Sequence, residues 1–197
     1  GIMAGLVVMT VGGNSARALK KDTSRIQQLL VMAQDEATFS GQEIGFFIDR
    51  DQKFYGFLTF DNKNLTWGAM EKDAFSQREL PEGIRLSLDV DGEPVDLKKI
   101  YKDALGKSGT QDNWLTSTDD SKDKRSKDSS KDSRSKVLPS LIFFSDGHYT
   151  PFRLQVSHSL VKDAVYAIDG DGLDVVHMSE AQSSRKKATK KQKSANE

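Results

Sequence analysis

The chain opens on an apolar run, residues 2–11, which carries no charged side chain and leads through Gly12-Gly13 into a more polar segment. A helix needs about 20 apolar residues to span a bilayer, and a run of roughly 10 to 14 is too short. The run therefore indicates a truncated membrane or assembly helix over residues 1–13, and we expect further apolar residues upstream. A buried core helix and the remnant of a cleaved signal peptide remain open as alternatives. The apolar side chains of this helix are Ile2, Met3, Leu6, Val7, Val8, Met9 and Val11.

Residues 14–40 show the three- and four-residue spacing of apolar side chains that is typical of an amphipathic helix. Asn14 or Ser15 could cap a new helix, but Gly12-Gly13 could equally lie within one continuous helix. Gly41 is a plausible C-terminal stop. One face of this helix is expected to pack on a sheet through Leu19, Ile26, Leu29, Leu30, Ala33 and Ala37.

Beyond Gly41 the period changes from helix to strand. Some segments alternate apolar and polar residues, which favours strands with one face in water, and others are apolar throughout, as buried strands are. The Asp-Gly pairs between them are typical of turns. The predicted strands are 44–48, 54–58, 84–90, 141–144, 152–156 and 165–168. A helix followed only by strands of antiparallel type is an α+β plan, with a β domain formed by residues 41–107 and 137–178.

Two segments are too polar to join this core. Residues 108–136 are almost wholly Lys, Asp, Ser and Thr, and such a composition cannot bury enough apolar surface to offset ordering entropy, so we expect a disordered insertion. Residues 179–197 form a basic tail that we expect to be flexible. The whole chain has 29 basic and 29 acidic residues and no cysteine, which removes a general attraction to nucleic acid as well as disulfides and thiolate chemistry.

Candidate chemistry is sparse. Ser145-Asp146-Gly147-His148 contains three residue types of a hydrolytic triad, but adjacency in sequence does not position a nucleophile against a base, and Asp-Gly between apolar runs indicates a hairpin turn. The three histidines lack metal-ligand spacing, and Asp169-Gly170-Asp171-Gly172 lacks the further ligands of a calcium loop. We therefore predict no enzyme activity, no metal and no cofactor.

Several short motifs flank the predicted elements. They are Ala33-Gln34-Asp35-Glu36-Ala37, Gly41-Gln42-Glu43-Ile44-Gly45, Phe54-Tyr55-Gly56-Phe57, Trp67, Ile142-Phe143-Phe144-Ser145-Asp146-Gly147, Thr150-Pro151-Phe152 and Gly170-Asp171-Gly172. Together with the apolar N-terminal helix, these motifs resemble the H-type minor pseudopilins of type II secretion, within the type IV pilin-like superfamily. The resemblance covers residues 1 to about 100 and 137–178.

The resemblance implies a pilin-like fold in which the long N-terminal helix packs on an antiparallel β domain of two small sheets, arranged like a sandwich. It implies a structural subunit near the tip of the periplasmic pseudopilus, which helps to drive the export of folded proteins across the outer membrane. The implied partners are other major and minor pseudopilins and secretion-machinery proteins. The implied location is the bacterial inner membrane, crossed once by the N-terminal helix, with the soluble domain in the periplasm. The family's processing site, methylated N-terminus and N-terminal glutamate have no counterpart in these residues and are not carried over.

Two other classes remain open. A minor type IV pilin that binds DNA through its basic tail is the main alternative. The sequence argues against nucleic acid as a partner, because the tail lacks interleaved aromatic residues and the Gly-Arg-X-Arg signature of such pilins. The candidate contacts are Arg185, Lys186, Lys187, Lys190 and Lys191. A membrane-tethered hydrolase that uses Ser145 and His148 is the more remote alternative.

Overall fold

The computed structural model describes residues 9–70, 72–99 and 137–182. Its longest element is α1 (Met9–Ser40), which runs through Gly12-Gly13 without a break, so the question that the sequence left open is decided in favour of one helix. Gly41 follows with a φ of 65°, the left-handed conformation that glycine adopts without strain, and the helix ends there as predicted.

The first sheet contains β1 (Ile44–Ile48), β2 (Phe54–Asp61), β3 (Thr66–Ala69), β4 (Arg78–Glu79) and β7 (Leu141–Phe143). Its main strand order is β3-β2-β1-β7, and β4 pairs with β2. The β1 and β2 strands form the predicted hairpin, with Phe46 opposite Phe57. The short helix η1 (Asp73–Phe75) lies between β3 and β4 in the chain and contacts α1.

The second sheet contains β5 (Ile84–Val90), β6 (Glu93–Pro94), β8 (Phe152–His158), β9 (Val161–Gly170) and β10 (His177–Gln182) in the order β10-β9-β8-β5-β6. In β5 and β8 the predicted alternation is visible in the register, where Leu86 faces Val156 and Leu88 faces Leu154. All strand pairs among the described residues are antiparallel. The predicted α+β arrangement, a long N-terminal helix with an antiparallel β domain of two sheets, is confirmed.

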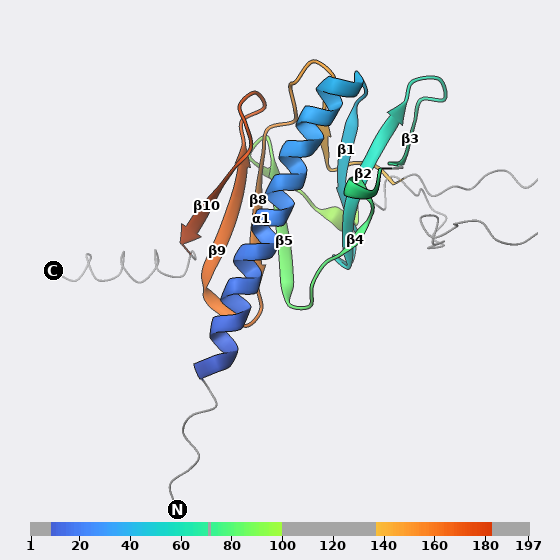
Figure 1. The fold of residues 1–197 in the computed structure, drawn as a ribbon. Coiled ribbons are helices and arrows are strands. Elements are labelled where there is room, and N and C mark those ends of the chain that lie inside the picture. Colours follow the sequence, from blue (N-terminus) through green and yellow to red (C-terminus); the bar gives the residue numbers. More distant parts are fainter. Residues whose placement is uncertain (1–8, 71, 100–136, 183–197) are drawn as a thin grey trace, which may run out of the picture.

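The core lies where α1 crosses the two sheets (Figure 1). The helix contacts β1 and β7 of the first sheet and β8, β9 and β10 of the second, so one helix face holds both sheets together. Phe46, Leu154 and Ile168 are fully buried in this core. The β1 strand is buried on both faces because Phe47 packs over Gly56 on the side away from α1.

Two sequence predictions are wrong in detail. Residues 179–182 were assigned to the flexible tail, but they belong to β10, whose backbone pairs with residues 164–167 of β9. An edge strand is held by main-chain hydrogen bonds and needs no apolar alternation, so its polar sequence gave no signal. Phe144 was assigned to a buried strand but follows β7 and is 37 % exposed, because the chain turns there.

Candidate assembly surfaces

The six residues predicted to pack the helix on the sheet all lie on the buried face of α1. Leu19, Leu30, Ala33 and Ala37 are fully buried, and Ile26 and Leu29 are 1 % and 7 % exposed. Thr23 lies on the same face, and its hydroxyl donates a 2.7 Å hydrogen bond to the carbonyl of Leu19. The sequence did not point to Thr23, although its spacing of four residues from Leu19 places it on the stripe.

The residues predicted for the membrane or assembly helix are only partly within the described structure. Ile2, Met3, Leu6, Val7 and Val8 lie outside the described residues, while Met9 and Val11 belong to the first turns of α1. Among the described residues, no helix contains a stretch long and apolar enough to cross a membrane.

The exposed side chains of α1 change sign along the helix. Basic residues, Arg17, Lys20, Lys21 and Arg25, are exposed in its first half. From Gln27 to Ser40 the helix has no Lys or Arg and carries Asp35, which is exposed, and Glu36, which is partly buried and paired with Lys72 at 2.7 Å. The end of the molecule that contains Ser40, the last residue of α1, is called the distal end below.

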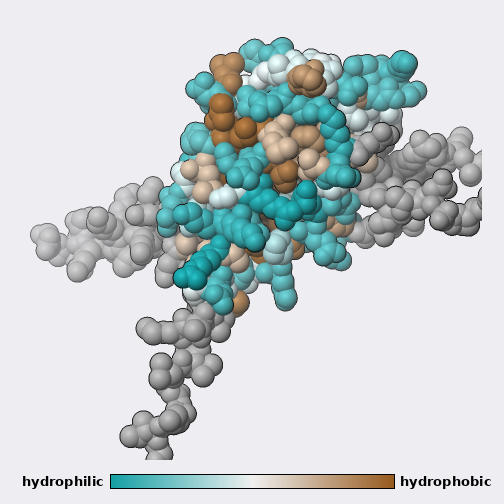
Figure 2. Space-filling model, in the orientation of Figure 1, coloured by the Kyte–Doolittle hydropathy of each residue, from teal (hydrophilic) through white to brown (hydrophobic). Residues whose placement is uncertain are grey.

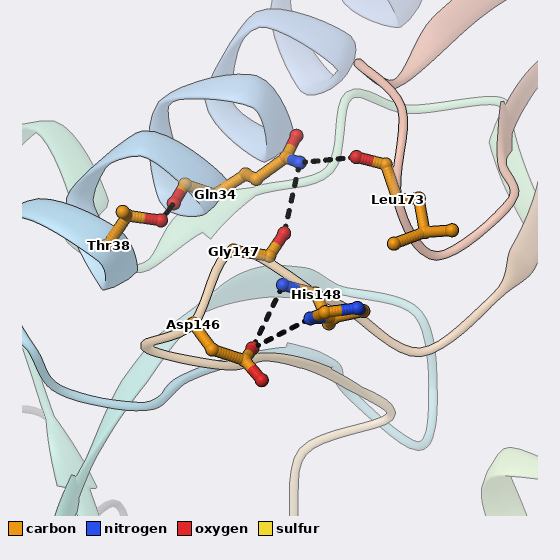
Figure 3. A network of polar contacts seen from close by, with 6 residues as sticks. All are labelled: Gln34, Thr38, Asp146, Gly147, His148 and Leu173. Carbon is orange, nitrogen blue, oxygen red and sulfur yellow. Dashed lines mark hydrogen bonds and ion pairs between the residues drawn. The ribbon is translucent and has the colours of Figure 1, made fainter.

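At the distal end, two glutamines of α1 bind loops that are far away in sequence. Figure 3 shows the first of them, Gln34. The side-chain amide of Gln34 donates to the carbonyls of Gly147, at 3.3 Å, and Leu173, at 3.5 Å. Gln27 donates to the carbonyl of Val176 at 3.0 Å. These bonds fix the 144–148 turn and the β9–β10 loop, residues 171–176, against the helix.

The β9–β10 loop is also fixed from within. One carboxylate oxygen of Asp171 accepts the backbone N–H groups of Leu173 and Asp174, at 3.0 and 2.8 Å. The bonds from Leu173 and then Asp174 hold the pKa of Asp171 below its ordinary value. The buried Tyr149 hydroxyl donates to the carbonyl of Asp174 at 2.6 Å, and burial raises the pKa of Tyr149, which keeps the donor protonated.

Large apolar side chains are exposed around these fixed loops. Figure 2 shows apolar side chains gathered at the upper part of the face in view, toward the β9–β10 connection. Leu173 and Val175 of the loop are 65 % and 66 % exposed, and Phe39, at the end of α1, is 89 % exposed. Folded chains leave scattered apolar residues in water, but a cluster on a fixed loop is typical of an interaction surface. The sequence Asp169-Gly170-Asp171-Gly172 predicted a turn, but nothing in it pointed to the exposed aliphatic residues that follow.

The Ser145–His148 segment forms the predicted turn. Gly147 has a φ of 91°, and the N–H of Phe144 donates to the carbonyl of His148 at 2.8 Å. Asp146 Oδ1 accepts the backbone N–H of His148 at 3.0 Å and lies 3.2 Å from its ring Nδ1. This carboxylate therefore serves the turn, and no group of three or more potential metal ligands is found within the described residues. The tail residues Arg185, Lys186, Lys187, Lys190 and Lys191 lie outside the described residues.

No protein-family model matches the chain. Among curated proteins, the chain is 24 % identical over 172 residues to the type II secretion system protein H of Pseudomonas aeruginosa. The aligned residues cover 87 % of this chain and 82 % of that protein. The predicted resemblance to the H-type minor pseudopilins is confirmed.

The fold has a solved counterpart. The structure of the minor pseudopilin EpsH from the type 2 secretion system of Vibrio cholerae superposes with a TM-score of 0.52 at 18 % identity, covering 83 % of this chain and 96 % of that one. A crystal structure of the same pseudopilin gives a TM-score of 0.49 at 19 % identity, with 86 % and 95 % covered. The long helix on two antiparallel sheets is thus the arrangement found in a solved minor pseudopilin.

Proposed function

We propose that this chain is a minor pseudopilin, a non-enzymatic structural subunit of the pseudopilus of a type II secretion system. The observation that carries the proposal is the similarity to type II secretion system protein H along 87 % of the chain, on a fold shared with a minor pseudopilin. It acts by assembling with other pilin-like subunits rather than by transforming a substrate.

The burial along α1 supports this role. The buried stripe begins at Leu19, whereas Gly13, Asn14, Arg17 and Ala18 are exposed. These four residues are therefore left largely uncovered by the chain's own sheets, and this part of the helix follows the apolar residues 2–8 in the sequence. We propose that this end of the helix lies in the inner membrane before assembly and among the helices of neighbouring subunits afterwards, with the β domain in the periplasm.

A secretion assay tests the proposal. A strain that lacks its own H-type minor pseudopilin is supplied with the natural gene that encodes this chain, and the export of type II substrates to the medium is measured. We expect export to be restored, and we expect the chain to co-purify with other minor pseudopilins. A second gene carrying Gln28→Ala, at an exposed position on α1, serves as the control and should behave like the natural gene. Unrestored export from a stably expressed protein that binds no other pseudopilin would refute the proposal.

A further inference from the structure

The β9–β10 loop combines exposed aliphatic side chains with a fixed backbone. Leu173 and Val175 are 65 % and 66 % exposed, while Val176, next in the chain, is 1 % exposed and anchors the loop in the core. Two aliphatic side chains exposed to water do not stabilise the free monomer. They stabilise a complex only when another surface covers them.

The backbone that carries these side chains is held by four side chains through five hydrogen bonds. The Asp171 carboxylate accepts two N–H groups of the loop, the Tyr149 hydroxyl binds the carbonyl of Asp174, and Gln34 and Gln27 bind the carbonyls of Leu173 and Val176. A loop that is already ordered loses little conformational entropy on docking, which favours affinity. The loop is therefore suited to contact a partner without rearrangement.

The charge around the loop restricts the chemistry of that partner. Hydrogen bonds join the C-terminal part of α1, the 144–148 turn and the β9–β10 loop at the distal end. Over residues 27–43, 140–152 and 167–177 the sequence has no Lys or Arg. The acidic residues of these segments are Asp35, Glu36, Glu43, Asp146, Asp169, Asp171 and Asp174. Two of them are paired with basic residues from outside the segments, Asp169 with Arg153 at 2.6 Å and Glu36 with Lys72 at 2.7 Å, so the acidic character of the loop rests chiefly on Asp171 and Asp174. An apolar surface with an acidic surround is complementary to an apolar surface with a basic surround.

This chain carries a basic surface of its own at the other end of α1. Arg17, Lys20, Lys21 and Arg25 are exposed in the first half of α1, at the end of the helix opposite to the β9–β10 loop (Figure 1). Subunits stacked with the same polarity bring the distal end of one toward the first half of the helix of the next. Opposite charges then meet at the contact.

We propose that the β9–β10 loop is a preformed docking element, in which Leu173 and Val175 insert into an apolar depression with a Lys- and Arg-rich rim on a neighbouring pilin-like subunit of a different kind. This inference rests on the proposed function, since it names the chemistry of one partner surface in the assembly. Burial of the two side chains supplies affinity, and the Asp-rich surround selects the partner and its orientation.

The test compares two double variants of the whole chain. In one, Leu173→Ser and Val175→Ser remove the aliphatic side chains of the loop. In the matched control, Leu65→Ser and Leu160→Ser change residues that are 73 % and 63 % exposed and lie outside the acidic segments. Affinity for each other minor pseudopilin is measured by surface plasmon resonance, and the melting temperature of each variant is recorded. We expect the loop variant to bind one partner about tenfold or more weakly, and the control to bind like the natural chain.

Two further variants test how much the fixed backbone of the loop and its negative charge each contribute to partner binding, apart from the apolar side chains. Tyr149→Phe removes only the hydroxyl that holds the loop carbonyl, and we expect it to weaken binding with the docking side chains intact. Asp174→Asn removes one charge of the surround, and we expect it to slow association and to reduce the dependence of the association rate on salt.

Each outcome decides the inference. If the natural chain binds a partner and the loop variant binds it equally well, the docking role of the loop is wrong while the proposed function stands. If the loop variant loses only self-association, the occupant is a second copy of the chain and the proposed neighbour is wrong. If the affinity and the association rate do not change with salt or with Asp174→Asn, the proposal that the partner surface has a basic rim is wrong. If the natural chain binds no pilin-like subunit at all, the proposed function itself fails.

Discussion

Gln52 joins the two sheets at the end opposite to the distal loops. It lies in the β1–β2 turn, and its side-chain amide makes two hydrogen bonds of 2.9 Å with the backbone of Leu86 in β5, one to the carbonyl and one from the N–H. The amide thus takes the place of a neighbouring strand at Leu86, on the side of β5 where β6 pairs only with Asp89 and Val90. Gln52 has a φ of 55°, so the turn accepts a strained residue to present this side chain.

Gln52→Ala should lower the free energy of unfolding by about 1 to 3 kcal/mol, because two partly buried hydrogen bonds contribute roughly 0.5 to 1.5 kcal/mol each. Alanine is as strained as glutamine at this φ, so the difference in the free energy of unfolding between Gln52→Ala and the natural chain measures the contribution of the amide. Gln52→Gly also loses the amide but relieves strain of roughly 1 to 2 kcal/mol, and we expect it to be less destabilised than Gln52→Ala.

Urea unfolding followed by circular dichroism gives the stabilities, and hydrogen exchange gives the local effect. We expect faster exchange at the Leu86 amide in Gln52→Ala, with little change in the slope of free energy against urea. Gln28→Ala, at an exposed position of α1, is the control and should lie within about 0.5 kcal/mol of the natural chain. If Gln52→Ala matches this control, or if the protection of the Leu86 amide is unchanged, the two hydrogen bonds do not join the sheets in solution.

Three other changes test the core, the first sheet and the distal loop. Leu30→Ala empties a fully buried position and should cost about 2 to 5 kcal/mol in chemical unfolding, whereas Leu160→Ala, at a position 63 % exposed, should cost under about 0.5 kcal/mol. Gly45→Ala would place a Cβ 2.5 Å from a proline side chain and should lower the melting temperature, while Gly68→Ala meets nothing within 4 Å and should leave it within a few degrees; equal melting temperatures would contradict the close packing. The N–H bonds from Leu173 and Asp174 hold the pKa of Asp171 below 3.8, so the contribution of its carboxylate to loop order is present above the unfolded-state pKa and is lost as pH falls through the lowered folded-state pKa. NMR signals of the loop should show this acid step, and Asp171→Asn should abolish it.

The helix and the half-buried strands could be predicted because their residues alternate between one apolar and one polar surface. The face of α1 that includes Leu30 and the alternation from Ile84 to Val90 follow from backbone period alone, and the structure has both. The edge strand β10 could not be predicted, because its partner is the backbone of β9 and its own side chains carry no period. The prediction that Phe144 lies in a buried strand was wrong for the opposite reason. Its apolar side chain continued the pattern of β7 beyond the point at which the chain turns.

The candidate assembly surface was only half visible in the sequence. Asp171 and the glycines around it indicated a turn, and the turn is present. What the turn presents depends on Gln27, Gln34 and Tyr149, which are 22 to 144 residues distant from Asp171 in the chain, so no local pattern could connect them.

The sequence by itself determined the order of the elements, the apolar face of the helix and the resemblance to pseudopilins, because period and local motifs are properties of neighbouring residues. Only the tertiary structure decided that α1 continues through Gly12-Gly13, that Gln52 joins the sheets, and that Leu173 and Val175 stand in water on a fixed, acidic loop. Exposure and long-range hydrogen bonding depend on which distant segments the fold brings together, and they are set by packing rather than by local preference.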